Sequence, residues 1–153
     1  MAPVLPPDAR NAPRGSQFLE DYFNYNVDFF DLAADATQQG NIQIQADSAF
    51  KWTAAAVQCD LDGAAYTAET RPIPLCTLQM IDTGSGRQLF FNPIPVETVF
   101  GWGGLPFILP VPRIFMPRSN ITFTITNFSV DQTYDVRLIL SGTKVFSAGG
   151  NVP

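Results

Sequence analysis

NITFTITN (Asn120–Asn127) alternates apolar and polar residues without a break. Isoleucine or phenylalanine occupies positions 121, 123 and 125, and threonine occupies positions 122, 124 and 126. Successive side chains of a β-strand point to opposite faces of a sheet, and β-branched and aromatic residues are enriched in strands. The segment therefore predicts a strand with Ile121, Phe123 and Ile125 in a core and its threonines on the other face.

The same alternation recurs at residues 22–30 (YFNYNVDFF), 42–46 (IQIQA), 75–82 (LCTLQMID) and 134–140 (YDVRLIL). Residues 49–59 (AFKWTAAAVQC) are more mixed, and we expect a strand there from about Phe50 to Val57. DLAADATQQ, which begins at Asp31, has helical character and predicts about two turns at most. Several short strands at this spacing predict an all-β protein, an antiparallel β-sandwich that is jelly-roll-like.

Turn signals separate the predicted strands. DTGSGRQ contains Gly84 and Gly86, and glycine adopts positive φ at little steric cost, so this segment predicts a hairpin turn. NFSVDQT contains Asn127 and Asp131, whose side chains mimic backbone turns, and it predicts a second turn.

We expect three parts: an extended Pro-rich N-terminal arm (residues 1–17), a β-sandwich domain (18–147) and a flexible C-terminal tail (148–153). Proline fixes φ and has no backbone donor, so the arm should lack hydrogen-bonded structure of its own. Its prolines are Pro3, Pro6, Pro7 and Pro13. Two interpretations stay open, a disordered tail and an arm that lies on a neighbouring subunit.

The run LPFILPVPRIFMP (residues 105–117) combines large apolar side chains with four prolines. Proline cannot donate to a sheet ladder, so we expect an edge strand or a meandering loop. The large side chains cannot all reach one core from such a path, and an apolar patch with a polar rim usually marks an interaction site. Our contact candidates are Phe107, Ile108, Leu109, Ile114, Phe115 and Met116, with Pro3, Pro6 and Pro7 of the arm. The alternative is that these residues cap the open end of the sandwich.

The composition of the chain limits the classes of partner that it could bind. Hydrophobic residues make up 46% of the chain and charged residues only 15%, so the surface is rich in uncharged polar groups or is partly covered by another protein. The net charge of −5 argues against direct nucleic-acid binding, which needs a basic footprint. No apolar run is long enough to span a membrane, and the N-terminus does not resemble a secretory signal. We therefore expect a chain that is made and folds in a cytoplasm.

Catalysis is not expected, and neither is a metal or another cofactor. The chain has no histidine, and Cys59 has no basic neighbour in sequence that would activate a thiol. CDLDG (residues 59–63) resembles the start of a calcium loop, but the twelfth position from Asp60 is Arg71 rather than glutamate. Cys59 and Cys76 are expected to be small buried hydrophobes, although a bridge between them stays open. A hidden carboxylate pair also stays open, because spatial pairing is not readable from sequence.

Three segments together resemble small virion structural proteins of tailed bacteriophages, the decoration or cement proteins of the head. They are GNIQIQADSAFKW (40–52), residues 80–127 and YDVRLILSGTKVF (134–146), with DTGSGRQ, PFILPVPRIF and LILSGTKVF as the most recognisable parts. The likeness runs from about Tyr22 to Phe146. It implies a β-sandwich that bridges subunits of the major capsid protein on the capsid exterior, assembled in the host cytoplasm as a homo-oligomer, a dimer or trimer.

Two other functions remain open from the sequence. One is a structural component of the phage tail, collar or baseplate. The other is a carbohydrate-binding sandwich for attachment to the host surface, with Trp52 or Trp102 stacking on a sugar ring.

Overall fold

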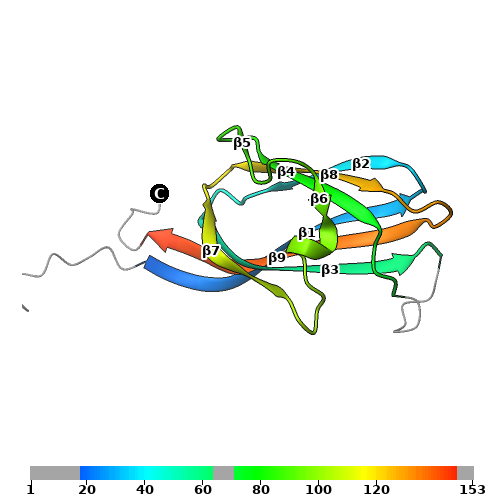
Figure 1. Ribbon diagram of the computed structural model, residues 1–153. Coiled ribbons are helices and arrows are strands. Elements are labelled where there is room, and N and C mark those ends of the chain that lie inside the picture. Colours follow the sequence, from blue (N-terminus) through cyan, green and yellow to red (C-terminus); the bar gives the residue numbers. More distant parts are fainter. Residues whose placement is uncertain (1–17, 64–70, 148–153) are drawn as a thin grey trace, which may run out of the picture.

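The computed structural model describes residues 18–63 and 71–147, which form two β-sheets packed face to face (Figure 1). In chain order the elements are β1 (Phe18–Leu32), β2 (Thr37–Gln43), β3 (Ala49–Leu61), β4 (Cys76–Asp82), β5 (Arg87–Gln88), β6 (Ile94–Pro95), α2 (Val96–Val99), β7 (Phe107–Phe115), β8 (Asn120–Asn127) and β9 (Tyr134–Ser147). The predicted arm (1–17) and tail (148–153) lie outside the described residues.

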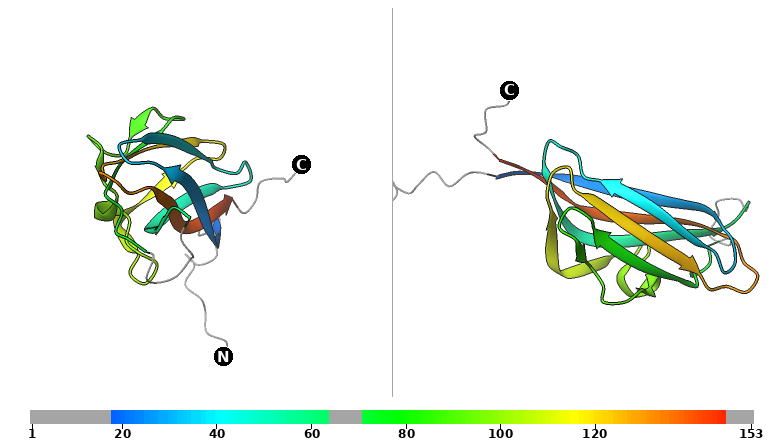
Figure 2. Two further views of the ribbon diagram at one scale, coloured as in Figure 1. Left: turned by 90° about the vertical axis from the view of Figure 1, so that its right-hand side faces the viewer. Right: turned by 90° about the horizontal axis from the view of Figure 1, so that it is seen from above.

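Each sheet is antiparallel throughout. One has the strand order β1-β9-β3-β7, and the other has the order β2-β8-β4-β5, with β6 also pairing with β4. Figure 2 shows the two layers from the end and from above. The prediction of an all-β antiparallel sandwich is confirmed.

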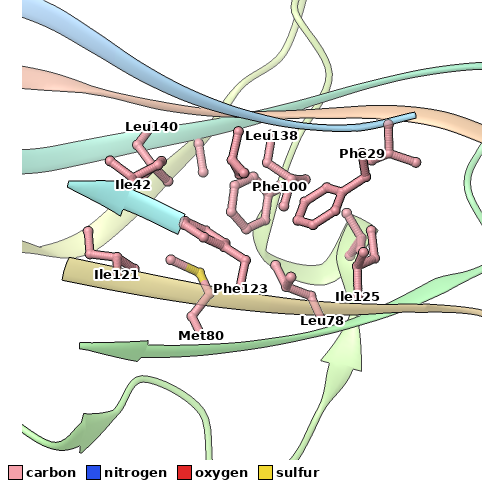
Figure 3. Close-up of a cluster of buried hydrophobic side chains, with 14 of the residues drawn as sticks. Phe29, Ile42, Leu78, Met80, Phe100, Ile121, Phe123, Ile125, Leu138 and Leu140 are labelled. Atoms are coloured by element: carbon pink, nitrogen blue, oxygen red, sulfur yellow. The ribbon is translucent and has the colours of Figure 1, made fainter. Parts of the chain in front are cut away.

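The core lies between the two sheets, and Figure 3 shows side chains from both of them meeting there. β8 supplies Ile121, Phe123 and Ile125, all fully buried, as the alternation of NITFTITN predicts. β9 contributes the side chains of its even-numbered positions from Tyr134 to Leu140, also as predicted. Strict alternation therefore gives the inward face directly wherever a strand is regular.

β3 is the strand with the mixed pattern, and the reason is a bulge at Thr53. Trp52 pairs with Gly142 of β9 and Ala54 pairs with Ser141, so Thr53 is an extra residue on β3. Before the bulge the even-numbered Phe50 and Trp52 face the core, and after it the odd-numbered Ala55 and Cys59 do. A single inserted residue thus reverses which side chains of the strand point inward.

Between β1 and β2 the chain makes a turn that crosses from one sheet to the other, so the predicted helix beginning at Asp31 is wrong. Asp31 and Asp35 both have positive φ, at 53° and 57°, which a right-handed helix does not allow. Leu32 is fully buried as the end of β1, and its burial outweighs the helix propensity of the neighbouring alanines. Among the described residues, no helix is long and apolar enough to cross a membrane.

Both predicted turns are present. Gly86 has φ +67° in the hairpin between β4 and β5, as DTGSGRQ predicts. In the turn between β8 and β9 the buried Asn127 amide donates to the carbonyls of Leu32 (3.0 Å) and Gln132 (2.8 Å). This side chain ties the turn to the end of β1 and satisfies backbone groups that would otherwise be buried without partners.

Replacing Gly142 with alanine should destabilise the fold. A Cβ at this position would lie 1.9 Å from the Lys51 carbonyl oxygen, so the strands at the bulge would have to separate. Because such overpacking typically costs about 1–3 kcal/mol, we expect Gly142→Ala to lower the free energy of unfolding by about that amount. Denaturant titration measures the change. Gly103→Ala is the control, since a Cβ there meets nothing within 4 Å, and equal effects of the two substitutions would contradict the explanation.

Candidate functional site

The candidate contact surface begins on β7, the edge strand of the four-stranded sheet. β7 pairs with β3 at its two ends, through Phe107 and Ile108 and again through residues 113–115. Residues 109–112 between them have no partner on β3, and they include Pro110 and Pro112, which have no donor to offer. The prediction of an edge strand is confirmed. Proline on an open edge also limits uncontrolled pairing with another sheet.

The structure places the six predicted contact residues of this run in three different environments. Ile108, Ile114 and Met116 are 66%, 62% and 65% exposed. Phe107 and Leu109 are half-buried. Phe115 is 2% exposed and stacks on Trp52 with ring centroids 6.1 Å apart, so it belongs to the core and offers no surface to a partner.

Val111 is a surface residue that the sequence analysis missed. It is 74% exposed and lies between Pro110 and Pro112, in the segment that has no partner on β3. Its position between two prolines was the available signal, because such a residue cannot be held in a ladder on both sides. Pro3, Pro6 and Pro7 lie outside the described residues.

A tight loop beside β7 presents a second apolar group. Gly101 pairs with β3 just past the point where β7 stops pairing with it. Its N–H donates to the Ala55 carbonyl (3.2 Å), and its carbonyl accepts from Val57 N–H (2.6 Å). The loop closes where Leu105 N–H donates to the Trp102 carbonyl (2.9 Å). A Cβ on Gly101 would lie 2.2 Å from the Leu105 carbonyl oxygen, so only glycine fits this close approach.

The two tryptophans have opposite environments. Trp52 is buried and its indole N–H donates to the Ala54 carbonyl (2.7 Å), so it is a core residue and not a stacking platform. Trp102 is 66% exposed on the tight loop, next to the exposed Leu105. Of the two candidates for stacking on a ligand, Trp102 is therefore the one that the structure makes accessible.

A groove of about 610 Å³ lies next to this loop. It is lined by residues 56–59 of β3, by Ile139 of β9, and by residues from the segments 71–74 and 97–105. Trp102, Leu105, Ile73 and Pro72 make its lining mainly apolar, and Glu97 and Arg71 add one side chain of each charge. Segments far apart in the sequence build this groove, and the sequence analysis did not predict it.

The two cysteines are free and buried, Cys59 on β3 and Cys76 on β4. Burial is the main cause that raises the pKa of each thiol to about 12, and the nearby Cys76, Asp60 and Asp135 add to the effect on Cys59. A nucleophilic cysteine needs the opposite, a lowered pKa and access to a substrate. Both residues therefore act as small core side chains, as expected.

We predict that neither thiol reacts with Ellman's reagent at pH 8 while the protein is folded. With a pKa near 12, only about one thiol in ten thousand is ionised at that pH, and both sulfur atoms are shielded. After unfolding in guanidinium chloride both thiols should titrate, which serves as the internal control. Rapid labelling of either cysteine in the native protein would contradict this assignment.

Three carboxylates meet at the end of the sandwich where β1 and β3 end and β9 begins. Oxygen atoms of Asp31, Asp62 and Asp135 all lie within 4.8 Å of one another, and Asp135 also accepts from Asp31 N–H (2.9 Å). Asp31 and Asp62 are exposed, and calcium takes six to eight oxygen ligands. Three exposed or half-buried carboxylates are too few to assign a metal site.

The cluster has a consequence for stability. A hydrogen bond shared with Asp31 is the largest cause that raises the pKa of Asp62, and burial and the charges of Asp31 and Asp135 act in the same direction. The folded state therefore holds this proton more tightly than the unfolded chain. The stability linked to it is fully present below about pH 3.8 and is lost as the pH rises through the elevated pKa.

Asp62→Asn should therefore raise the thermal midpoint at pH 7, because the amide keeps a donor toward Asp31 and removes one of the three charges. The gain should disappear near pH 3, where the carboxyl group of the parent protein is protonated in both states. Thermal unfolding from pH 3 to 8 tests this, with Asp131→Asn in the exposed β8–β9 turn as the control. A gain that stays constant across this range would show that the charge cluster is not its cause.

Two further ion pairs are made by residues of β9. Arg137 and Asp28 pair across β9 and β1 (2.7 Å), and this hydrogen bond lowers the pKa of the Asp28 carboxyl. The mostly buried Lys144 ammonium lies 4.3 Å from the Phe23 ring centroid and 3.2 Å from Asp47. Both pairs join segments of the sandwich, and they provide no reactive group.

No known protein family and no curated protein matches this chain. We therefore infer the function from the exposed side chains on β7 and on the neighbouring loop.

Proposed function

We propose that this chain is a non-enzymatic structural protein of a phage virion, which decorates the capsid and stabilises it by bridging subunits of the major capsid protein. The observation that supports this most is the exposed apolar edge formed by Ile108, Val111, Ile114 and Met116 on β7 and just after it. Several exposed apolar side chains along one strand edge are typical of a surface that another protein covers.

Burial of the apolar β7 edge against a partner would contribute favourably to the free energy of assembly. A stable protein–protein interface buries about 800 Å² on each partner, and apolar burial contributes about 25 cal/mol per Å² before the costs of association. A chain with only 15% charged residues can give up an apolar edge without desolvating many charges. Burying a charge without a partner carries a large desolvation cost.

We further propose that the sandwich is a jelly roll. The supporting observation is that strands close in sequence alternate between the sheets: β1, β3, β7 and β9 lie in one, and β2, β4, β5 and β8 in the other. Viral capsid domains and lectins are among the proteins that use this architecture. The assignment to a virion, on the capsid exterior with the major capsid protein as partner, rests on the resemblance to small phage head proteins.

A second function has one specific observation in its favour. Trp102 is exposed on a loop held in place at Gly101, and an exposed indole on a fixed loop is suited to stacking on a sugar ring. A glycan-binding screen with Trp102→Ala as the control tests this function. Binding that depends on Trp102 would favour host-surface attachment over capsid decoration.

The first test is copy number and location in the intact particle, by quantitative mass spectrometry and imaging of virions. Hundreds of copies spread over the shell are expected for a decoration protein. A few copies confined to one vertex would instead make it a tail, collar or baseplate component. Absence from the particle would overturn the proposal as a whole.

A triple substitution tests the contact surface directly. Ile108→Ser, Ile114→Ser and Met116→Ser together should lower occupancy on purified particles about tenfold or more, because a few apolar anchors dominate most interfaces. The fold should survive, since all three side chains are exposed. Phe91→Ser with Val130→Ser is the matched control, because both residues are at least as exposed and lie off β7. Unchanged occupancy of the triple variant would remove β7 from the contact surface.

A further inference from the structure

We propose that the groove beside Trp102 binds the proline-rich segment Pro3–Pro7 of a second copy of this chain. The groove is a defined site of about 610 Å³ rather than a flat patch, and Trp102, Leu105, Pro72 and Ile73 are among the residues that line it. This inference concerns how copies associate with each other, and it holds or fails on the purified chain without any capsid.

The lining suits a polyproline ligand. Extended proline-rich segments dock into grooves lined by aromatic side chains, because the ligand is already ordered and loses little entropy on binding. Trp102 presents its indole to solvent, while the bonds of Gly101 to β3 and the Leu105–Trp102 turn fix the loop that carries it. The aromatic wall is thus in place before a ligand arrives, which lowers the cost of binding.

The segment has the matching pattern. Residues 3–7 read PVLPP, which contains the PxxP spacing of Pro3 and Pro6. A polyproline helix has three residues per turn, so in that bound conformation these two prolines would lie on one face and would contact the groove together. Val4, Leu5 and Pro7 provide further apolar contact area.

Charge also favours this occupant. Residues 1–17 contain two arginines and one aspartate, which gives a charge of +1. The rest of the chain therefore carries −6, and the whole chain has a net charge of −5. Arg10 follows the proline segment, and the groove is lined by the exposed carboxylate of Glu97 and by Arg71, so the attraction comes from the acidic body as a whole and from Glu97 rather than from a net negative groove. The basic residues 1–17 are attracted to the acidic remainder of other copies as well as to that of their own chain.

The register of the sheet favours a second copy over the chain's own arm. Groove residues 56–59 pair with β9 residues that in turn pair with residues 26–29 of β1, eight to eleven positions beyond Phe18. At about 3.3 Å per residue this is about 26–36 Å along the strands, and two strand spacings of about 4.8 Å at right angles to it make the direct distance about 28–38 Å. A link from Pro7 to Phe18 spans about 34 Å only if it is fully extended, so the chain's own segment would reach only the nearer part of its groove and only with a completely straight link, whereas a second copy has no such restriction.

A cross-linking experiment on the full chain tests both parts of the inference. Benzoylphenylalanine replaces Leu5, and copies with natural isotopes are mixed with ¹⁵N-labelled copies before irradiation. We expect links from position 5 to groove residues such as Ile73 and Leu105, in pairs that combine a light and a heavy peptide. Links within single copies only would overturn the role of the second copy, and links that avoid the groove would overturn the site.

Self-association of the full chain gives an independent readout by sedimentation velocity. Trp102→Ala should weaken it about tenfold or more, whereas Phe91→Ala, which removes an exposed ring outside the groove, should leave it unchanged. Glu97→Arg should weaken it as well, and Arg10→Glu in the same chain should restore it. A chain that stays monomeric up to millimolar concentration, or a Trp102→Ala variant that associates normally, would overturn the proposal.

Capsid decoration is read out separately from this experiment. Loss of self-association with normal particle occupancy would leave decoration standing, and the converse would leave the groove standing.

Discussion

One extra residue in β3 constrains much of the molecule. The bulge at Thr53 lets Trp52 face the core from one half of the strand and Ala55 from the other half. It requires the backbone of β9 to approach closely, which only Gly142 permits. Because the inward face changes there, Ala56 is buried outside the main core cluster and lines the groove. The core and the surface of this sheet thus depend on the same irregularity.

The β7 edge, which pairs with β3 on both sides of that bulge, has two properties that affect how it can contact another protein. Its apolar side chains are exposed, so burial against a partner would be favourable. It is also interrupted by Pro110 and Pro112, which prevent a continuous ladder of hydrogen bonds with another sheet. Contact through this edge must therefore use side chains, and side-chain shape selects partners more sharply than main-chain pairing does. The fixed loop at Gly101 extends the same strategy to Trp102.

Regular strands could be predicted from the sequence, and irregular features could not. NITFTITN alternates strictly, so its inward residues follow at once, and its pairing with β2 and β4 keeps that alternation. The mixed pattern of β3 indicated an irregularity but not its position, because several insertions produce a similar sequence. The segment after Asp31 misled because local propensity does not include the burial of Leu32. The groove and the cluster of Asp31, Asp62 and Asp135 depend on strand order, which a single sequence does not contain.

The pairing of Phe18 with Ser147 also decides how the sandwich bears mechanical load. β1 starts and β9 ends at the same end of the sandwich, side by side and antiparallel. Tension applied through both of these ends would open the β1–β9 ladder one rung at a time, like a zip, because its hydrogen bonds lie perpendicular to the strands. Tension applied across the faces would instead have to shear many rungs at once. A protein built in this way resists deformation through its faces and edges, and it yields first when pulled by its ends.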